Sequence, residues 1–324
     1  METTKWMKYL LVWAGLVAAV IAPITGRSDS GKGVIIPGRF DFKTFAISNQ
    51  VSLSVEDINI EGSVVGSFFV TNSGPVKSFE RFPNGNIVIQ DDPRDKGLPT
   101  DPFGGITQAG GLNAANVVVG QFYDSAAGHY AGYFLRNGDY QSYSVPGYAA
   151  TALFSVNDLG DFSGFVQNLT PSVVTKAFVN VNGHVTVFTI PGSQFVEATS
   201  INNYGVAVGD YQDAEGLYHG FIRDAFAHLT YPIDVPGVTT AAGLGTIPLG
   251  VNDFGAISGH FWDSAVKEHG FLRLPNGQYL QIDVPGAAST GGGGLNDFGV
   301  VVGHYNDQNG NQIGYIAVPD FDHP

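Results

Sequence analysis

The amino-acid sequence predicts an all-β protein, specifically a β-propeller built from four-stranded antiparallel blades. An Asn preceded by an apolar residue recurs six times at intervals of 44 to 54 residues, which is the length of a four-stranded sheet rather than of a helix pair. The chain also contains 44 Gly and 12% aromatic residues but only 14% charged residues, a composition typical of short strands joined by tight turns. The six residues are Asn59, Asn113, Asn157, Asn202, Asn252 and Asn296.

The fourth copy shows how one repeat is expected to fold. Short runs of alternating apolar and small or polar residues are separated by turns that contain Gly, whose freedom to adopt a positive φ suits tight turns. Pro236 ends the last run because proline cannot donate a hydrogen bond to a strand ladder. The predicted strands are residues 198–202, 206–211, 218–223 and 229–235.

Neither face of this predicted sheet is polar. Val206 and Val208 point to one side and Ala207 and Gly209 to the other, so both sides must pack against neighbouring repeats. A radial propeller meets that requirement and leaves only short edges at its rim.

The two ends of the repeat region predict how the ring closes. The sixth copy supplies three strands between residues 295 and 318, and the chain then lacks a fourth. Residues 39–47 precede the first copy and resemble an isolated fourth strand. If this segment completes the last blade, the ring closes with six blades; seven blades or an open stack are the alternatives.

The domain organisation follows from these boundaries. Residues 39–318 form one propeller domain and residues 319–324 a C-terminal tail. Residues 1–26 place Lys5 and Lys8 before an apolar run, the pattern of a signal peptide. We therefore expect a secreted, extracellular or cell-envelope protein, with a retained N-terminal membrane anchor as the alternative.

Composition excludes several classes of function. The net charge is −14, so the chain lacks the basic footprint that nucleic acid or anionic lipid requires. There is no Cys, which rules out disulfides, a thiol nucleophile and Cys-ligated zinc. We expect no nucleic-acid partner, contact with a membrane only through a retained N-terminus, no cofactor, and a monomer.

Three short motifs of the fourth copy return in the fifth copy at the same order and similar spacing. The fourth copy has Ile201-Asn-Asn-Tyr-Gly205, His219-Gly-Phe221 and Ile233-Asp-Val-Pro-Gly237, and the fifth has Val251-Asn-Asp-Phe-Gly255, His269-Gly-Phe271 and Ile282-Asp-Val-Pro-Gly286. This pattern resembles the bacterial probable extracellular repeats called the HAF family, over residues 40–318. The resemblance implies an exported repeat protein without an assigned reaction. The second and third copies depart from it, with Gly132-Tyr-Phe134 and Lys176-Ala-Phe178 in place of the His triplet.

One rim of the predicted propeller is the candidate binding site. In a meander the turn between the second and third strands lies on the same rim as the connection between blades, and the longest insertions, residues 91–111 and 238–250 with the shorter 287–294, fall in those connections. Loops held by a rigid scaffold commonly build binding sites. The candidate ligand-binding residues at this rim are Asp124, Asp213, His219, Asp263, His269, Asp307, Tyr123, Tyr218 and Trp262.

Each of these residue types also has a structural interpretation. An Asp that opens a turn accepts hydrogen bonds from backbone N–H groups two or three residues on. His219 and His269 each follow such an Asp by six residues and can bond back across the turn. The aromatic residues suit stacking on sugar rings but also ordinary packing between blades.

A second polar position precedes the aromatic residue of the second strand, and it is occupied by Ser67, Gln121, Asp210, His260 and His304. These side chains line the central channel or bond to the neighbouring blade, since a buried polar group is costly unless paired. Equivalent atoms on adjacent blades should lie ~10 Å apart, whereas metal–ligand bonds are roughly 2 Å. A shared ion would have to lie near the axis, and we predict no metal site.

The sequence favours a non-catalytic module that binds a glycan, a peptide or another surface protein, because it carries a complete scaffold and no coherent catalytic set. G-x-S-x-G, P-loop and H-E-x-x-H motifs are absent. The alternatives are a hydrolase or lyase that acts on an extracellular polymer through two rim carboxylates, and a structural or adhesive envelope protein. No residue is assigned a catalytic role.

Overall fold

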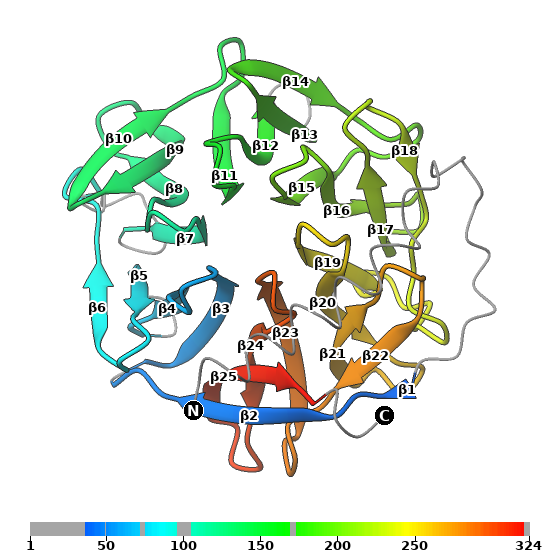
Figure 1. Ribbon diagram of the computed structural model, residues 1–324. Helices are drawn as coiled ribbons and strands as arrows, with labels where there is room; N and C mark the ends of the chain where they lie inside the picture. The colour runs from blue at the N-terminus through cyan, green and yellow to red at the C-terminus, as the bar shows by residue number, and fades with distance from the viewer. Residues whose placement is uncertain (1–35, 49, 72–74, 96–104, 169–172, 321–324) are drawn as a thin grey trace.

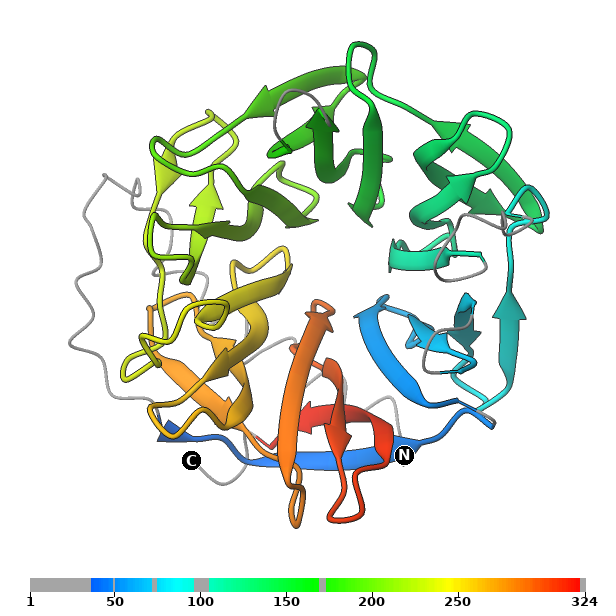
Figure 2. The ribbon, with the colours of Figure 1, turned by 180° about the vertical axis from the view of Figure 1, so that it is seen from behind.

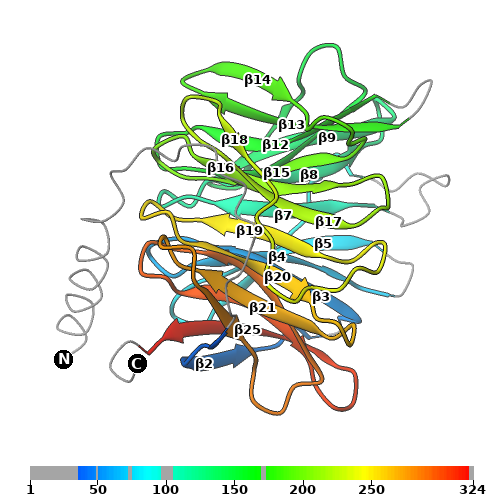
Figure 3. The same ribbon diagram turned by 90° about the vertical axis from the view of Figure 1, so that its right-hand side faces the viewer.

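A computed structural model describes residues 36–48, 50–71, 75–95, 105–168 and 173–320 of the chain. Within these residues there are strands and turns but no helices. The strands form six antiparallel sheets arranged as the blades of a closed ring (Figures 1 and 2), and the side view shows the sheets as layers across the disc (Figure 3). The predicted six-bladed propeller is confirmed.

Blades 1 to 3 follow one another along the chain, each with its first strand innermost. Blade 1 is β3 (Ser52–Ile58), β4 (Val64–Phe69), β5 (Val76–Arg81) and β6 (Ile87–Gln90). Blade 2 is β7 (Thr107–Leu112), β8 (Val118–Asp124), β9 (His129–Arg136) and β10 (Asp139–Tyr143). Blade 3 is β11 (Ala150–Val156), β12 (Phe162–Asn168), β13 (Val174–Val181) and β14 (His184–Phe188).

Blades 4 to 6 complete the ring in the same order. Blade 4 is β15 (Val196–Ile201), β16 (Ala207–Gln212), β17 (Tyr218–Arg223) and β18 (Leu229–Thr230). Blade 5 is β19 (Thr246–Val251), β20 (Ile257–Trp262), β21 (Glu268–Arg273) and β22 (Tyr279–Ile282). Blade 6 is β23 (Ser289–Leu295), β24 (Val301–Asn306), β25 (Gln312–Pro319) and, from the start of the chain, β2 (Phe40–Phe45).

The N-terminal strand closes the ring as the sequence predicts. β2 pairs antiparallel with β25 over six residues, from Phe40 opposite Pro319 to Phe45 opposite Gly314. The preceding strand β1 (Ile36–Pro37) adds a parallel fifth strand to blade 5 by pairing with β22, which the sequence does not predict. The start of the chain therefore joins two blades.

Two predicted boundaries are wrong. The fourth strand of blade 4 ends at Thr230 instead of Val235, because Pro232 has no N–H for the ladder and the Ile233 N–H bonds to the Gly220 carbonyl outside it. Residues 287–294 are not chiefly an insertion, since most of them belong to the innermost strand β23, which begins at Ser289 and ends at Leu295 instead of beginning there.

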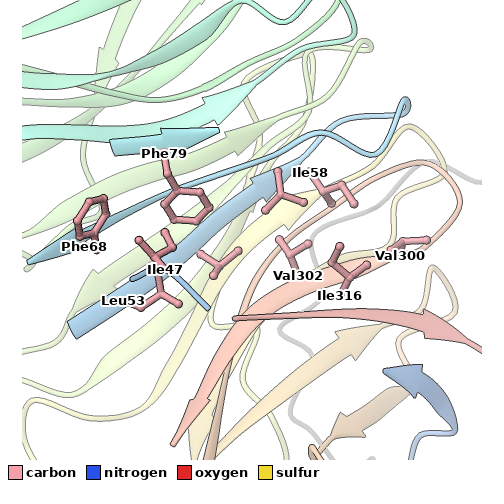
Figure 4. Close-up of a cluster of buried hydrophobic side chains, with 10 residues drawn as sticks. Ile47, Leu53, Ile58, Phe68, Phe79, Val300, Val302 and Ile316 are labelled. Atoms are coloured by element: carbon pink, nitrogen blue, oxygen red, sulfur yellow. The ribbon is translucent and has the colours of Figure 1, made fainter. Parts of the chain in front are cut away.

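Hydrophobic side chains fill the space between neighbouring blades. The cluster in Figure 4 joins Leu53 and Phe79 of blade 1 to Val302 and Ile316 of blade 6. Phe79 and Val302 are fully buried. Because burying a large apolar side chain contributes about 1.5–3 kcal/mol, these interfaces hold the blades together without disulfides.

The six recurring Asn residues form a closed ring of hydrogen bonds around the axis. The Nδ2 group of each Asn donates to the backbone carbonyl of the Asn in the next blade, and Asn296 of blade 6 donates to Asn59 of blade 1, at donor–acceptor distances of 2.9–3.2 Å. Their Oδ1 atoms accept N–H groups of their own turns, such as those of Tyr204 and Val206 on Asn202. The turns between first and second strands therefore share one face, which we call the Asn-ring face.

The opposite face, which we call the loop face, carries the turns between second and third strands and the connections between blades. In the connection from blade 4 to blade 5, Leu244 accepts a hydrogen bond from Tyr218, and Thr239 donates one to the carbonyl of Trp262. This confirms how the sequence assigns loops to the two rims.

The proposed signal peptide and most of the C-terminal tail lie outside the described residues. In the part of the chain that the structure describes, no helix has the length and apolar character needed to cross a membrane.

Candidate functional site

The four rim Asp residues all have the structural role expected of a turn residue. One carboxylate oxygen of Asp213 accepts the N–H groups of Glu215 and Leu217, at 3.0 and 2.8 Å. Asp263 repeats this arrangement with Ala265 and Lys267. In the same way, Asp124 Oδ1 accepts the backbone N–H groups of Ala126 and Ala127, and Asp307 Oδ1 accepts those of Asn309 and Asn311.

In blade 4 the second oxygen of the turn Asp meets the recurring His. Asp213 Oδ2 lies 3.1 Å from His219 Nε2, and Asp234 Oδ2 lies 2.7 Å from His219 Nδ1. The imidazole also stacks on the ring of Tyr211, with 5.3 Å between centroids. The bond back across the turn is confirmed, and a second carboxylate completes an Asp–His–Asp relay.

Blade 5 contains the same relay. His269 Nε2 lies 3.3 Å from Asp263 Oδ2, His269 Nδ1 lies 2.7 Å from Asp283 Oδ1, and the imidazole stacks on Phe261. The carboxylate side chains of Asp263 and Asp283 stay 35% and 40% exposed, whereas the His269 side chain is 7% exposed. The relay thus holds two accessible carboxylates on a buried imidazole.

Sequence reasoning missed Asp234 and Asp283 as site residues. Both belong to the Ile-Asp-Val-Pro-Gly motif that recurs in the two copies, which was the available signal. The motif was interpreted as the end of a fourth strand. In the structure both residues instead follow the last paired residue of the blade and turn a carboxylate toward the His of the third strand.

The neighbouring carboxylates favour the protonated form of both His residues. The hydrogen bond to Asp234, together with the charges of Asp234 and Asp213, raises the pKa of His219 to about 9 despite its burial. The bond to Asp283 likewise raises the pKa of His269. Desolvation opposes ionisation of Asp213 and Asp263, but hydrogen bonds from Leu217 and Lys267 N–H groups and from the His lower the pKa of both carboxyls. At neutral pH His219 is therefore protonated and lies between two carboxylates, and the same arrangement of charges favours the protonated form of His269.

Blades 2 and 6 have the turn Asp without the relay. Asp307 Oδ2 accepts the Asn311 side-chain amide at 2.8 Å, so a neutral partner replaces the imidazolium. His129 follows Asp124 by five residues, and its Nδ1 faces the Tyr130 carbonyl instead.

The three candidate aromatic residues are not brought onto the relays. In blade 4, Tyr218 pairs opposite Gln212 while His219 pairs opposite Tyr211, and because neighbouring residues of a strand point to opposite faces, Tyr218 faces away from the relay. Its ring meets Phe195 edge-on at 5.7 Å. Trp262 contacts His260, and Tyr123 contacts Tyr130. All three are half-buried.

The second polar position shows both predicted behaviours. Ser67 accepts the N–H of Ala109 in the next blade, and His260 Nδ1 lies 3.1 Å from the Gly292 carbonyl in the next blade. Burial lowers the pKa of His304, which lies near Glu268 and His260. Within the described residues no group of three His, Asp or Glu side chains is arranged to hold a metal ion.

Asp210 differs from these because it faces a cavity in the central channel. The cavity has a volume of about 210 Å³ and is lined by residues of blades 1 to 5, among them Glu56, Glu197 and Tyr218. Sequence reasoning singled out Asp210 but missed Glu197, which is directly opposite it in the register of β15 and β16. Burial raises the pKa of Asp210 to about 8, and burial with the charge of Asp210 raises the pKa of Glu197.

Comparison with known proteins supports the fold. No protein-family model matches the chain, and no curated protein matches it in sequence. Among solved structures, the chain is similar to the Aleuria aurantia lectin in complex with Fucalpha1-6GlcNAc, with a TM-score of 0.51 and 10% identity over 87% of this chain and 98% of that one. The chain is also similar to AofleA from Arthrobotrys oligospora, with a TM-score of 0.49 and 14% identity over 90% of this chain and 89% of that one. For the β-propeller domain of the Trilobed protease from Pyrococcus furiosus, the TM-score is 0.42 and the identity is 8%, over 84% of this chain and 99% of that one. At these identities the likeness concerns the fold alone.

Proposed function

We propose that the protein is an exported, non-catalytic binding module that holds a glycan at the loop face of blades 4 and 5. The observation that carries this proposal is the duplicated Asp–His–Asp relay. Each relay fixes two partly exposed carboxylates in a defined position, and carboxylates accept hydrogen bonds from hydroxyl groups, which are the main polar groups of sugars.

The rigidity of these carboxylates favours binding. Side chains that are already immobilised lose little conformational entropy when a ligand arrives. The fold likeness to a lectin, whose structure contains a fucosylated disaccharide, is compatible with such a ligand.

Export and family membership belong to the same proposal. The N-terminal pattern of Lys5, Lys8 and an apolar run supports a signal peptide, and the repeated His-Gly-Phe triplets support a place among the HAF repeats. N-terminal sequencing of protein from the culture medium should begin near Arg27; protein that stays with the membrane would favour an anchor.

The rim does not support the alternative of a hydrolase or lyase. Such an enzyme needs one carboxyl that keeps its proton and acts as a general acid. The pKa of Asp213, Asp263 and Asp307 is lowered instead, so these groups are ionised and have no proton to donate.

A glycan and polysaccharide array tests the proposal. The purified protein should be retained by a subset of glycans without loss of arrayed polymer. The double variant D234N/D283N should bind those glycans at least tenfold more weakly, since it removes one carboxylate charge from each relay but keeps the side-chain shape. Loss of polymer would indicate turnover and contradict a non-catalytic role.

Two controls separate a binding role from a general loss of charge. Glu215→Gln neutralises an exposed residue of the same turn as Asp213, and Asp307→Asn changes the turn of blade 6 that lacks a relay. Both should leave glycan retention unchanged. A blank array, or equal weakening by Asp307→Asn, would remove the support for a glycan site in blades 4 and 5.

A further inference from the structure

The cavity in the central channel carries an inference beyond the proposed glycan site. Its walls combine two kinds of group: carboxyl groups from Glu56, Glu197 and Asp210, and aromatic rings from Phe154, Phe195 and Tyr218. Phe195 and Tyr218 stand edge to face at 86°, so they form one corner of the cavity. These residues come from three different blades, so closure of the ring brings them together.

Asp210 is buried without a partner. Its residue is 3% exposed, and in the described part of the chain no hydrogen bond or ion pair reaches its carboxyl group, although it lines the cavity. A buried, ionised carboxyl in this state is unfavourable unless a proton or a cation compensates its charge. The relays at the rim are the contrast, since every relay carboxylate there has at least one donor.

Glu197 is a second acid that lies beside Asp210 and lacks a cationic partner among the described residues. It is the cross-strand neighbour of Asp210, and such neighbours have Cβ atoms about 4.5–5.5 Å apart and point to the same side of the sheet. No Lys, Arg or His of the described chain pairs with Glu197 either. Two adjacent acids that face an open volume without a cation of their own are complementary to a cation supplied from outside.

The aromatic walls indicate which kind of cation. An organic ammonium ion is stabilised by the faces of aromatic rings as well as by carboxylates, whereas a metal ion requires a set of convergent oxygen or nitrogen ligands, and no such set exists among the described residues. The volume of about 210 Å³ limits the ligand to a small amine, of about the size of benzylamine.

We propose that the channel cavity binds a small primary ammonium ion that carries an apolar group, with Asp210 and Glu197 on the charge and Phe154, Phe195 and Tyr218 around the apolar part. This site is distinct from the relays of the loop face, and either can fail in experiment without the other.

Proton release accompanies binding. Burial raises the pKa of Asp210 to about 8 and also raises the pKa of Glu197, so burial favours the protonated form of both acids. A bound cation favours the ionised form, so binding expels a proton into solvent. Glu56 and Tyr218 are the other titratable groups that line the cavity. Affinity should therefore rise between pH 6 and pH 8, as long as the amine keeps its own proton.

Isothermal titration calorimetry of the full chain tests the proposal with benzylamine, its neutral analogue benzyl alcohol, putrescine and calcium chloride. Benzylamine should bind and benzyl alcohol should not. Asp210→Asn and Glu197→Gln, which keep side-chain volume, should each weaken benzylamine at least tenfold, while Asp139→Asn on the exposed outer strand β10 should leave its affinity unchanged.

A second measurement needs no variant. Titrations of the wild type at pH 6.5 in buffers of different ionisation enthalpy should show release of a proton on benzylamine binding. The proposal is overturned if neither benzylamine nor putrescine binds, if benzyl alcohol binds as well as benzylamine, if calcium binds in their place, or if binding releases no proton.

Discussion

The two faces of the propeller use the same repeat in opposite ways. On the Asn-ring face all six blades contribute the same Asn, and each donates to the next until the ring closes. On the loop face, among the turns that the structure describes, only those of blades 4 and 5 add a His and a second Asp to the turn Asp. A residue that recurs in every copy therefore holds the fold together, and a residue confined to two neighbouring copies is the better candidate for a ligand.

The rim Asp residues sharpen that lesson. They recur in four copies and cap their own turns in all four, so recurrence alone does not indicate a binding site. Blades 4 and 5 differ in the partner of the second carboxylate oxygen of the turn Asp. In these two blades that oxygen contacts the imidazole of a His, whereas in blade 6 it accepts the neutral side-chain amide of Asn311.

The largest expected effect comes from opening the ring. Removal of residues 27–48 deletes β2, its ladder with β25, and the contacts of Phe42 with Tyr315. Loss of this partly buried aromatic surface should cost on the order of 5 kcal/mol, which corresponds to a fall in melting temperature of about 10 °C or more. Differential scanning calorimetry measures it.

Lys43→Ala is the matched control, since this exposed residue lies on the same strand and should leave the melting temperature within about 1–2 °C. An unchanged melting temperature after the deletion would show that the stability of the ring does not depend on its N-terminal strand.

The next effect tests the Asn-ring face. Asn202→Ala leaves the partly buried N–H groups of Tyr204 and Val206 without their acceptor and removes the donor to the Asn252 carbonyl, and should lower the free energy of unfolding by about 2–4 kcal/mol. Asn202→Asp keeps the acceptor for the turn but sets a carboxylate oxygen against the Asn252 carbonyl in a buried site, so it should also destabilise the fold. Urea denaturation measures both.

Tyr204→Ala controls for the turn itself. Tyr204 is 69% exposed, and its removal should change the free energy of unfolding by less than about 0.5 kcal/mol. If Asn202→Ala were equally mild, the ring would be a by-product of the turns rather than a bond between blades.

Sequence reasoning predicted local and repetitive features well. The spacing of the Asn residues predicted the blade count, the orphan strand before the first copy predicted the closure, and the six-residue offset from Asp213 to His219 predicted their contact. Each of these depends on a short segment whose hydrogen-bond partners follow from one strand or one turn.

Features that depend on the register between distant segments were not predicted. The Asn ring joins residues 44 to 237 positions apart, and no property of a single Asn shows where its amide points. The sequence predicts only that Glu197 lies in a strand, and the register between β15 and β16 shows that Asp210 lies opposite it. Asp234 was hidden because Pro232 ends the strand earlier than its apolar pattern suggests.

The smallest expected effect tests the loop face through pH. The pKa of His219 is raised to about 9 in the folded protein, against about 6.5 in an unfolded chain. The protonated relay therefore contributes its full stability below about pH 6.5 and loses it as the pH rises through 9. The upper limit for blade 4 is about 3 kcal/mol, and the partial exposure of Asp213 and Asp234 reduces it.

The channel acids titrate over part of the same range, so the test compares variants in one background. The raised pKa of Asp210 makes the folded state hold a proton that the unfolded chain loses, and stability falls from about pH 4 to pH 8 for that reason alone. In a chain that carries D210N and E197Q, the remaining fall in melting temperature between pH 6.5 and 9 should shrink with His219→Gln and shrink further with H219Q/H269Q. Asp57, whose pKa is raised to about 7 by burial, keeps part of the slope at the lower end of this range. Asp307→Asn should leave the slope unchanged, because the partner of Asp307 is the uncharged Asn311. An equally steep slope in the double His variant would mean that the relays are not the charged centres that distinguish blades 4 and 5 from blade 6.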